Sequence, residues 1–210
     1  AHEIRNPLAG IKGAANLIES PATPADMRRG SLAIIHKEIR RLNRLLTNLL
    51  DFARPRAPEF HAVDPGQLID GIIGLAGHSA GQKGVTLRKD VAAGVPRVQG
   101  DPEQLKQVLL NLTINAIQAM DKRGEVVLAA RRKDASLLLS VRDQGPGIPE
   151  EDLDKIFNPF FTTKDAGTGL GLSVVHQIVT RHGGSVSVLR NSGGGMTFEV
   201  SIPLEHGSPK

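Results

Sequence analysis

Residues 101–120 read DPEQLKQVLLNLTINAIQAM, and this stretch sets the fold that we expect for most of the chain. Asp101 followed by Pro102 is typical of a helix start, because aspartate accepts hydrogen bonds from free backbone N–H groups and proline fits the first helical turn. Apolar residues then recur three and four positions apart, at Leu105, Val108, Leu109, Leu112 and Ile117. This period predicts an amphipathic helix with one face buried in a core.

Two asparagines lie on the same predicted helix. Asn111 and Asn115 are four positions apart, so they share one face. A side-chain amide oxygen is a suitable ligand for a hard cation whose charge is already balanced by phosphate groups. Paired asparagines on a helix are more often solvated or bonded to nearby backbone, so the pair alone leaves both interpretations open.

The sequence on both sides of this helix alternates between helical and strand patterns. We expect helices over residues 65–82 and 168–182, strands over 85–89, 125–132 and 136–142, and a closing hairpin of 185–189 with 196–202. Helices packed on one mixed sheet make an α/β sandwich. The pattern therefore predicts such a domain over residues 59–204, followed by a tail at 205–210.

Residues 1–58 have a purely helical pattern. Apolar residues spaced three and four apart form one seam in residues 4–18 and another in residues 32–49. The segment 20–26 between them contains two prolines, which cannot continue the first helix. We expect an antiparallel helical hairpin, so the fold class of the whole chain is α+β, and residues 54–58 form a short stiff linker.

Two helices alone leave part of their apolar surface uncovered. We therefore expect a homodimer through residues 1–58, in which two hairpins form a four-helix bundle. The alternative is a hairpin that packs against the second domain instead.

The composition excludes several classes of function. The absence of cysteine rules out disulfides, thiolate metal sites and a cysteine nucleophile. Tryptophan and tyrosine are also absent, so we expect no stacking on bases and no nucleic-acid partner. The apolar stretches are too short to span a bilayer, so we expect a cytoplasmic piece with no membrane contact. The chain starts at Ala1 in mid-pattern, so we expect it to belong to a longer protein, either soluble or membrane-anchored.

The segment DQGPG at residues 143–147 follows a predicted strand. Two glycines around a proline let the backbone pass close to a flat ligand, and the carboxylate of Asp143 can accept a hydrogen bond from an exocyclic amine. An aspartate near glycine also marks ordinary turns, so this motif alone does not establish a ligand.

Residues 167–172 read GTGLGL and open a predicted helix. Alternate glycines free the backbone to curl, and the first turn of a helix offers unpaired N–H groups to phosphate oxygens. We reject a dinucleotide-binding fingerprint, because the third glycine comes one position early and no strand leads directly into the loop.

These motifs occur together with a further one, NPFFTTK at residues 158–164. The set resembles the ATP-binding domain of bacterial two-component sensor histidine kinases, in the wider GHKL (Bergerat-type) family that includes gyrase, Hsp90 and MutL. HEIRNP at residues 2–7 is similar to the phosphoacceptor box of those kinases, and residues 1–58 resemble their dimerisation and histidine phosphotransfer hairpin. The sequences HEIRNPLAGIKGAA at residues 2–15 and NPFFTTK at residues 158–164 are most similar to those of the NtrB-like subgroup.

The resemblance implies which residues bind Mg-ATP. Asp143 would accept a hydrogen bond from the adenine amine, and the other residues expected near the ring are Gly145, Gly147 and Thr197. Asn111 and Asn115 would face the Mg²⁺ ion and the triphosphate. The residues expected to wrap the phosphates are Gly167, Thr168, Gly169, Leu170 and Gly171. Lys164, in a mobile lid formed by residues 158–168, would reach a terminal phosphate or is a solvated loop lysine.

The same resemblance implies a phosphoryl transfer. His2 would be the nucleophile, because an imidazole has an unprotonated nitrogen available near neutral pH, and Glu3 would assist removal of its proton. The phosphoryl group would pass to an aspartate on the receiver domain of a response regulator, and Asn6 would position water for removing it again. Gyrase-like relatives place a water-activating glutamate where this chain has Asn111, so the γ-phosphate would be kept for His2.

Two other functions stay open. One is a GHKL-type ATPase clamp without phosphotransfer, which requires steady ATP turnover. The other is a non-catalytic dimeric module that binds nucleic acid or a protein partner, which the ten basic and five acidic residues of 1–58 permit. Residues 116–119 lack the aromatic side chain that family members often place near adenine, which favours a modest affinity for ATP. Only Ala1 precedes His2, so we expect the first helical turn to fray and autophosphorylation of this chain to be weak.

Overall fold

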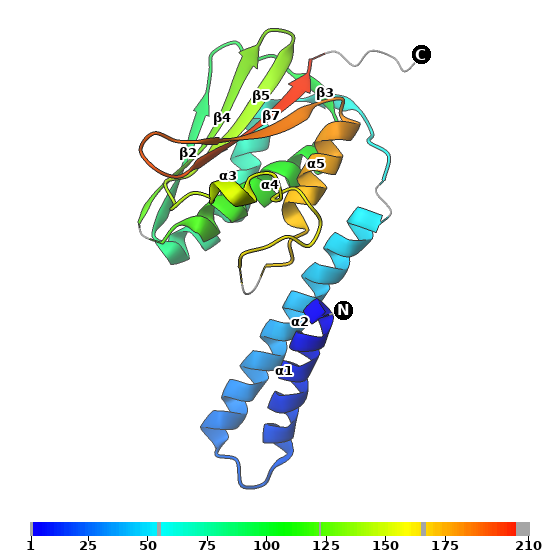
Figure 1. Ribbon diagram of the computed structural model, residues 1–210, viewed down its shortest axis with the longest axis vertical. Helices are drawn as coiled ribbons and strands as arrows, with labels where there is room; N and C mark the ends of the chain where they lie inside the picture. Colours follow the sequence, from blue (N-terminus) through cyan, green and yellow to red (C-terminus); the bar gives the residue numbers. More distant parts are fainter. Residues whose placement is uncertain (1, 54–55, 122, 165–166, 205–210) are drawn as a thin grey trace. The chain divides into compact units, whose positions relative to one another are not determined.

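The computed structural model describes residues 2–53, 56–121, 123–164 and 167–204, and it divides the chain into two compact units (Figure 1). The first unit contains the helices of residues 2–53, and the second contains most of the chain from Arg56 onward. The tail predicted at residues 205–210 lies outside the described residues. No helix in the described part of the chain combines the length and the apolar character needed to span a membrane.

The first unit is the antiparallel hairpin that the heptad spacing predicts. Helix α1 (His2–Glu19) and helix α2 (Ala25–Ala53) lie side by side, and their connection falls within the predicted turn (Figure 1). Arg28 closes this turn, because its guanidinium donates to the carbonyl oxygens of Ser20 at 3.1 Å and Pro21 at 3.4 Å. The small residues Ala14 and Ser31 are buried, which allows the two helices to pack closely.

Much of the apolar surface of the hairpin is exposed in a single chain. Large apolar side chains with more than two fifths of their surface exposed are Leu8, Leu17, Met27, Leu32, Ile34, Ile39 and Leu46. Four of these, Leu8, Leu32, Ile39 and Leu46, belong to the three-and-four spacing of the predicted seams. One hairpin therefore leaves its seams partly uncovered, as expected for an element that packs against a further surface.

The second unit is built on a five-stranded sheet with the order β2-β4-β5-β7-β6. The strands are β2 (Val85–Val91), β4 (Gly124–Lys133), β5 (Ser136–Arg142), β6 (Ser185–Arg190) and β7 (Met196–Pro203). Strands β2 and β4 are parallel, and the other neighbours are antiparallel. Alternate residues of β5 and β7 are buried, so one face of the sheet is apolar and the other is solvated.

Three helices cover the apolar face of this sheet (Figure 1). Helix α4 (Pro102–Ala119) lies between α3 (Pro65–Lys83) and α5 (Gly171–Arg181). The predicted start of α4 is confirmed, since Asp101 caps it by accepting from the N–H groups of Glu103 and Gln104. The predicted helical hairpin and α/β sandwich are therefore both confirmed.

Three details differ from the sequence prediction. A two-stranded sheet of β1 (His61–Val63) and β3 (Val98–Gly100) was not expected, because three-residue strands carry no readable period. A short 3₁₀ turn, η1 (Glu150–Asp152), follows the DQGPG segment. The helix predicted from residue 168 is wrong at its start, because Gly169 has φ +65° and α5 begins at Gly171.

The assignment of faces on the central strand β5 can be tested by mutation. Leu139 is fully buried under the helices, whereas its neighbour Leu138 lies on the opposite face and is partly exposed. We expect Leu139→Ala to lower the free energy of unfolding by about 2–5 kcal/mol, because it leaves a cavity in the core. Leu138→Ala is the matched control. Equal losses for the two variants in urea unfolding would contradict the assignment.

Candidate functional site

Asp143 lies directly after β5, and its carboxylate is held by the backbone. The residue is 3% exposed, and its Oδ1 accepts from the N–H groups of Gly145 at 2.9 Å and Met196 at 3.1 Å. No described residue bonds Oδ2, so this oxygen is the one available to a ligand. An acceptor fixed at the end of the central strand suits recognition of a hydrogen-bond donor such as an amine.

Burial gives this carboxylate an unusual electrostatic setting. Loss of water raises the pKa of Asp143, and the two backbone donors and the charge of Lys164 oppose that rise. A charge kept where it is costly is more common at functional sites than elsewhere.

The loop after Asp143 packs against the end of α4. A Cβ atom at Gly145 would lie 2.9 Å from the carbonyl oxygen of Ala119, which is closer than side chains approach backbone. Glycine at 145 is thus required for packing within the protein. Gly147 lies two residues on, with φ +87°.

Asn191, which the sequence patterns do not reveal, connects two predicted site residues. Its amide nitrogen donates to the carbonyl oxygen of Asp143 at 3.0 Å, and its amide oxygen accepts from the hydroxyl of Thr197 at 2.7 Å. The structure therefore brings Thr197 near Asp143 through Asn191. The segment NSGGG at 191–195 shows only a turn in the sequence, so the long-range role of its asparagine has no local signal.

The two asparagines of α4 face the beginning of α5. Both are half-buried, and the amide nitrogen of Asn111 lies 3.5 Å from the carbonyl oxygen of Gly171. A Cβ atom at Gly171 would lie 3.9 Å from the amide nitrogen of Asn115. The prediction that these residues share a face is consistent with this arrangement, which places amide oxygens and a helix N-terminus together.

The glycine-rich loop is tied back to the segment that precedes it. The N–H of Phe160 donates to the carbonyl oxygen of Gly169 at 3.0 Å, and a Cβ atom at Gly169 would lie 2.3 Å from the carbonyl carbon of Phe160. Gly167 and Thr168 lie just before this contact. Leu170 is buried at the start of α5, and no side chain caps that helix. The N–H groups of its first turn are suited to an anion.

Lys164 lies near the C-terminal end of α4. Its ammonium donates to the side-chain oxygen of Gln118 at 3.0 Å, while Lys83 donates to the backbone oxygens of Gln118 and Met120. Desolvation and then repulsion from Lys83 lower the pKa of Lys164, and attraction to Asp143 opposes this change. In this structure Lys164 is therefore placed among α4, Lys83 and Asp143, and its contact with a phosphate stays a prediction.

The donor set limits how a metal ion could be held. The described residues include no group of three or more His, Cys, Asp or Glu side chains that could bind a metal. Asn111 and Asn115 offer neutral amide oxygens, which fit a hard divalent cation only when phosphate groups supply the negative charge. A Mg²⁺ ion fits this site as a companion of a nucleotide.

Two families match the two units of the chain. Residues 100–206 match the family described as "Histidine kinase-, DNA gyrase B-, and HSP90-like ATPase", and residues 1–58 match the "His Kinase A (phospho-acceptor) domain". The chain belongs to the sensor histidine kinase family. The predicted family and its ATPase-type domain are thus confirmed, whereas the NtrB-like subgroup stays a prediction.

Curated relatives of this histidine kinase chain are longer proteins. The sensor histidine kinase ZraS of Escherichia coli (strain K12) is 43% identical over 205 residues, which cover 97% of this chain and 44% of ZraS. The signal transduction histidine-protein kinase AtoS of the same organism is 35% identical over 205 residues, covering 97% of this chain and 34% of AtoS. The chain therefore spans less than half the length of these relatives.

Solved histidine kinases have the same fold. The kinase ThkA in complex with the response regulator protein TrrA is 30% identical, with a TM-score of 0.83 over 97% of this chain and 59% of that chain. Full-length ShkA in complex with AMPPNP is 31% identical, with a TM-score of 0.76 over 99% of this chain and 45% of that chain.

The segment HEIRNP, which the sequence predicts to be the phosphoacceptor box, lies at the beginning of α1. His2 and Glu3 are in its first turn, and their side chains lie outside the described part of the chain. Asn6 is exposed and one turn further along, on the same helical face as His2.

Asp143→Asn tests the electrostatic cost of the buried carboxylate. The amide oxygen can still accept from Gly145 and Met196, but no charge is buried. The pKa of Asp143 is higher in the folded state than in the unfolded state. Protonation of this group therefore stabilises folded wild type below about pH 4, and that stabilisation is lost as the pH rises through the raised pKa. We expect the variant to gain melting temperature relative to wild type between about pH 4 and about pH 8.

Thermal unfolding followed by circular dichroism measures this difference. Asp134→Asn, at an exposed position in the turn between β4 and β5, is the control and should show no such trend. The same melting difference at both ends of the pH range would disprove the expectation.

Proposed function

We propose that this chain is a histidine kinase core, which moves the γ-phosphoryl group of ATP to His2 and then to an aspartate of a response-regulator receiver domain. The observation that carries this proposal is the presence of a phospho-acceptor domain and a histidine kinase-like ATPase domain in one chain. The solved complex of ThkA with a response regulator supports the choice of partner.

Asp143 recognises the adenine end of the nucleotide in this proposal. Its Oδ2 accepts from the exocyclic amine, while Oδ1 stays bonded to the two backbone N–H groups. Asn191, in the turn after β6, bonds the backbone of Asp143 and is itself held by Thr197 on the neighbouring strand β7. The raised pKa of Asp143 fits this role, because a donor from the ligand would replace lost water.

The phosphate end is bound between α4 and α5. Asn111 and Asn115 would hold Mg²⁺, which neutralises phosphate charge when bound, and the uncapped first turn of α5 donates N–H groups to phosphate oxygens. The loop residues that wrap the phosphates are Gly167, Thr168, Gly169, Leu170 and Gly171. Lys164 would leave Gln118 to reach the terminal phosphate as a mobile point charge.

The imidazole of His2 is the nucleophile. One ring nitrogen attacks the γ-phosphorus, the bond from that phosphorus to the bridging oxygen breaks, and ADP leaves with its negative charge. Glu3 accepts the imidazole proton. Asn111 cannot act as a base toward water, so the triphosphate persists until His2 reaches it.

Transfer onward and removal of phosphate follow the same chemistry. A carboxylate oxygen of the regulator's aspartate attacks phospho-His2, and the nitrogen–phosphorus bond breaks. Asn6 is exposed on the same helical face and orients water against the regulator's acyl phosphate during its hydrolysis.

We also propose that two copies of the chain pair through residues 1–58. The exposed seam residues supply an apolar surface on each hairpin, and a second hairpin covers it symmetrically. A four-helix bundle is the economical result.

His2→Gln tests the phosphorylation site. We expect radiolabelled ATP to put acid-labile, base-stable phosphate on wild type and on the His36→Gln control, in which an exposed histidine of α2 is changed. His2→Gln should lose at least nine tenths of the label, because an amide is not a nucleophile, while it still binds a fluorescent ATP analogue. Equal labelling of both variants would contradict this role, and steady ADP release without label would favour the ATPase clamp.

A charge in the seam tests the dimer. Leu32 and Ile39 are seven positions apart on α2 and are 48% and 43% exposed. We expect wild type to be a dimer and the double variant Leu32→Asp/Ile39→Asp to be a monomer, because two buried charges face their copies. Lys37→Asp, on the opposite helical face, should stay dimeric. Light scattering at micromolar concentration measures this, and a monomeric wild type would rule the dimer out.

A further inference from the structure

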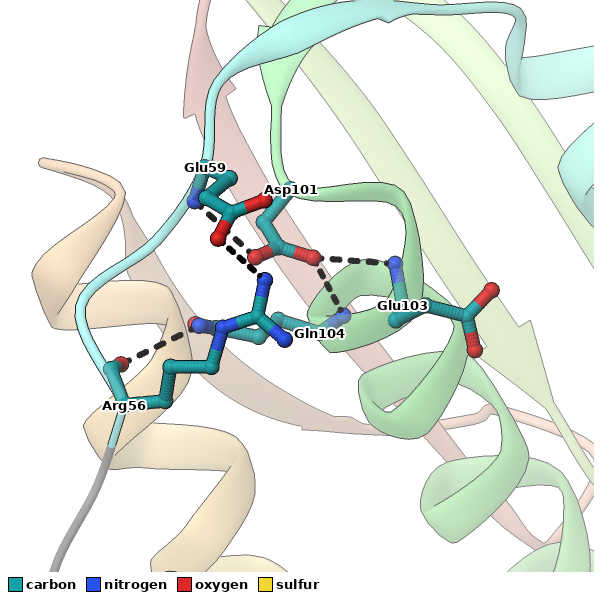
Figure 2. A network of polar contacts seen from close by, with 5 residues as sticks. All are labelled: Arg56, Glu59, Asp101, Glu103 and Gln104. Carbon is teal, nitrogen blue, oxygen red and sulfur yellow. Dashed lines mark hydrogen bonds and ion pairs between the residues drawn. The ribbon is translucent and has the colours of Figure 1, made fainter.

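Asp101 has two separate hydrogen-bonding roles. Its Oδ1 caps α4 by accepting from the N–H groups of Glu103 at 3.0 Å and Gln104 at 3.1 Å. Its Oδ2 accepts from the N–H of Glu59 at 3.0 Å, which is 42 residues earlier in the chain (Figure 2). Asp101 is 4% exposed, so this carboxylate is a buried junction between α4 and the segment 56–60, which begins the second unit.

A second junction fixes Arg56, the first described residue of that segment. Its carbonyl oxygen accepts from the side-chain amide of Gln104 at 3.2 Å and from the guanidinium of Arg181 at 3.1 Å. Gln104 belongs to α4 and Arg181 is the last residue of α5. The ion pair of Arg56 with Glu59 is 2.7 Å long, but both side chains are 67% exposed, so it contributes little alone (Figure 2).

His182 joins the same junction to the end of α5. It is fully buried, and its Nε2 accepts from the N–H of Asp101 at 3.0 Å. Its Nδ1 lies 2.8 Å from the carbonyl oxygen of Ile178, so a neutral ring with its hydrogen on Nδ1 satisfies both contacts. The ring of Phe60 packs edge-on against it, with centroids 5.3 Å apart. The segment 56–60 is thereby bound to α4 and α5 together.

We name this set of contacts the linker clasp, made by Arg56, Glu59, Asp101, Gln104 and His182. The helices that it joins lead directly to the proposed nucleotide site. Asn111 lies about 15 Å along α4 from Asp101, at 1.5 Å per residue. Gly171 begins the helix that His182 follows. The two helices are therefore tied at one end by Asp101 and His182, and they meet at the other end where Asn111 faces Gly171.

We propose that Asp101 is a positioning residue for nucleotide binding. Its Oδ2 bond to Glu59 couples the attachment of residues 56–60 to the position of α4. The proposal rests on the proposed function of Asn111 and Asn115. Attachment of the linker raises nucleotide affinity, and by thermodynamic linkage a bound nucleotide strengthens the attachment equally.

The charge state of Asp101 suits this role. Burial favours the neutral acid, but the N–H groups of Glu59, Gln104 and Glu103 and then the charge of Arg56 outweigh it and lower the pKa of Asp101. The residue therefore accepts all three bonds as a carboxylate near neutral pH. Charge-assisted bonds of this kind are the stronger class of hydrogen bond.

Asp101→Asn separates the two roles. The amide oxygen can cap α4 as aspartate does, but the NH₂ group cannot accept from Glu59. Asp64→Asn is the matched control, because Asp64 caps α3 through its Oδ1 with bonds from Gly66 at 2.8 Å and Gln67 at 3.1 Å. It makes the same cap without the linker contact.

Two measurements on the whole chain decide the proposal. Calorimetric titration with Mg-AMPPNP should show affinity about five- to tenfold weaker for Asp101→Asn, which is in the usual range for coupled sites, and within twofold of wild type for Asp64→Asn. Hydrogen exchange should show that AMPPNP slows exchange of the Glu59 amide in wild type and not in Asp101→Asn. A residue with only a stabilising role would not produce this nucleotide-dependent protection.

Each other result counts against the proposal. Equal affinity of wild type and Asp101→Asn overturns it, and so does an equal loss in both aspartate variants. If Asp101→Asn does not fold, Gln104→Met removes the contact of α4 with Arg56 and must weaken affinity at least twofold. A wild type that binds no nucleotide would instead overturn the proposed function, so the two failures are distinguishable.

Discussion

The apolar face of α4 is buried against the sheet and the two flanking helices, and the remaining features of the site depend on that burial. With this face fixed, the opposite side of the helix can only present polar groups in set positions. Asp101 is at its beginning, Asn111 and Asn115 follow, and Gln118 is near its end. Burial of side chains such as Leu105 and Leu112, both fully inaccessible, contributes about 1.5–3 kcal/mol each. Polar groups on one well-packed helix need little further ordering to act together.

The elements with a clear period were predictable from the sequence, and those that depend on distant partners were not. The hairpin, the five long strands and the cap at Asp101 follow from spacing and local chemistry. The sharing of a face by Asn111 and Asn115 follows from the helical period alone. The contact of Asp101 with His182 joins residues 81 positions apart, and neither residue type predicts the other. The place of Gly145 near a ligand stays a prediction, whereas its close approach to the carbonyl of Ala119 had no signal in the sequence.

Two charged groups at the proposed site have shifted pKa values, although Lys164 is exposed. Burial raises the pKa of Asp143, and desolvation lowers the pKa of Lys164, so each is displaced toward its neutral form. Their mutual attraction only partly offsets this, since it opposes both shifts. A nucleotide offers an amine hydrogen to the first group and phosphate charge to the second. In the proposed function, these contacts would favour the charged forms of both groups and so contribute to nucleotide affinity without an aromatic side chain at residues 116–119.

An amide at position 111 has a consequence for control as well as for chemistry. In the proposed function it binds a cation–phosphate pair without providing a base for water, so the site holds a triphosphate that does not react by itself. The rate then depends on delivery of an imidazole that belongs to the other unit of the chain. Under that condition the segment joining the units is the natural place for regulation. The hydrogen bonds from Asp101 to Glu59 and from Gln104 to Arg56, with the ring contact of His182 and Phe60, attach the beginning of the second unit to the helices that would hold the nucleotide.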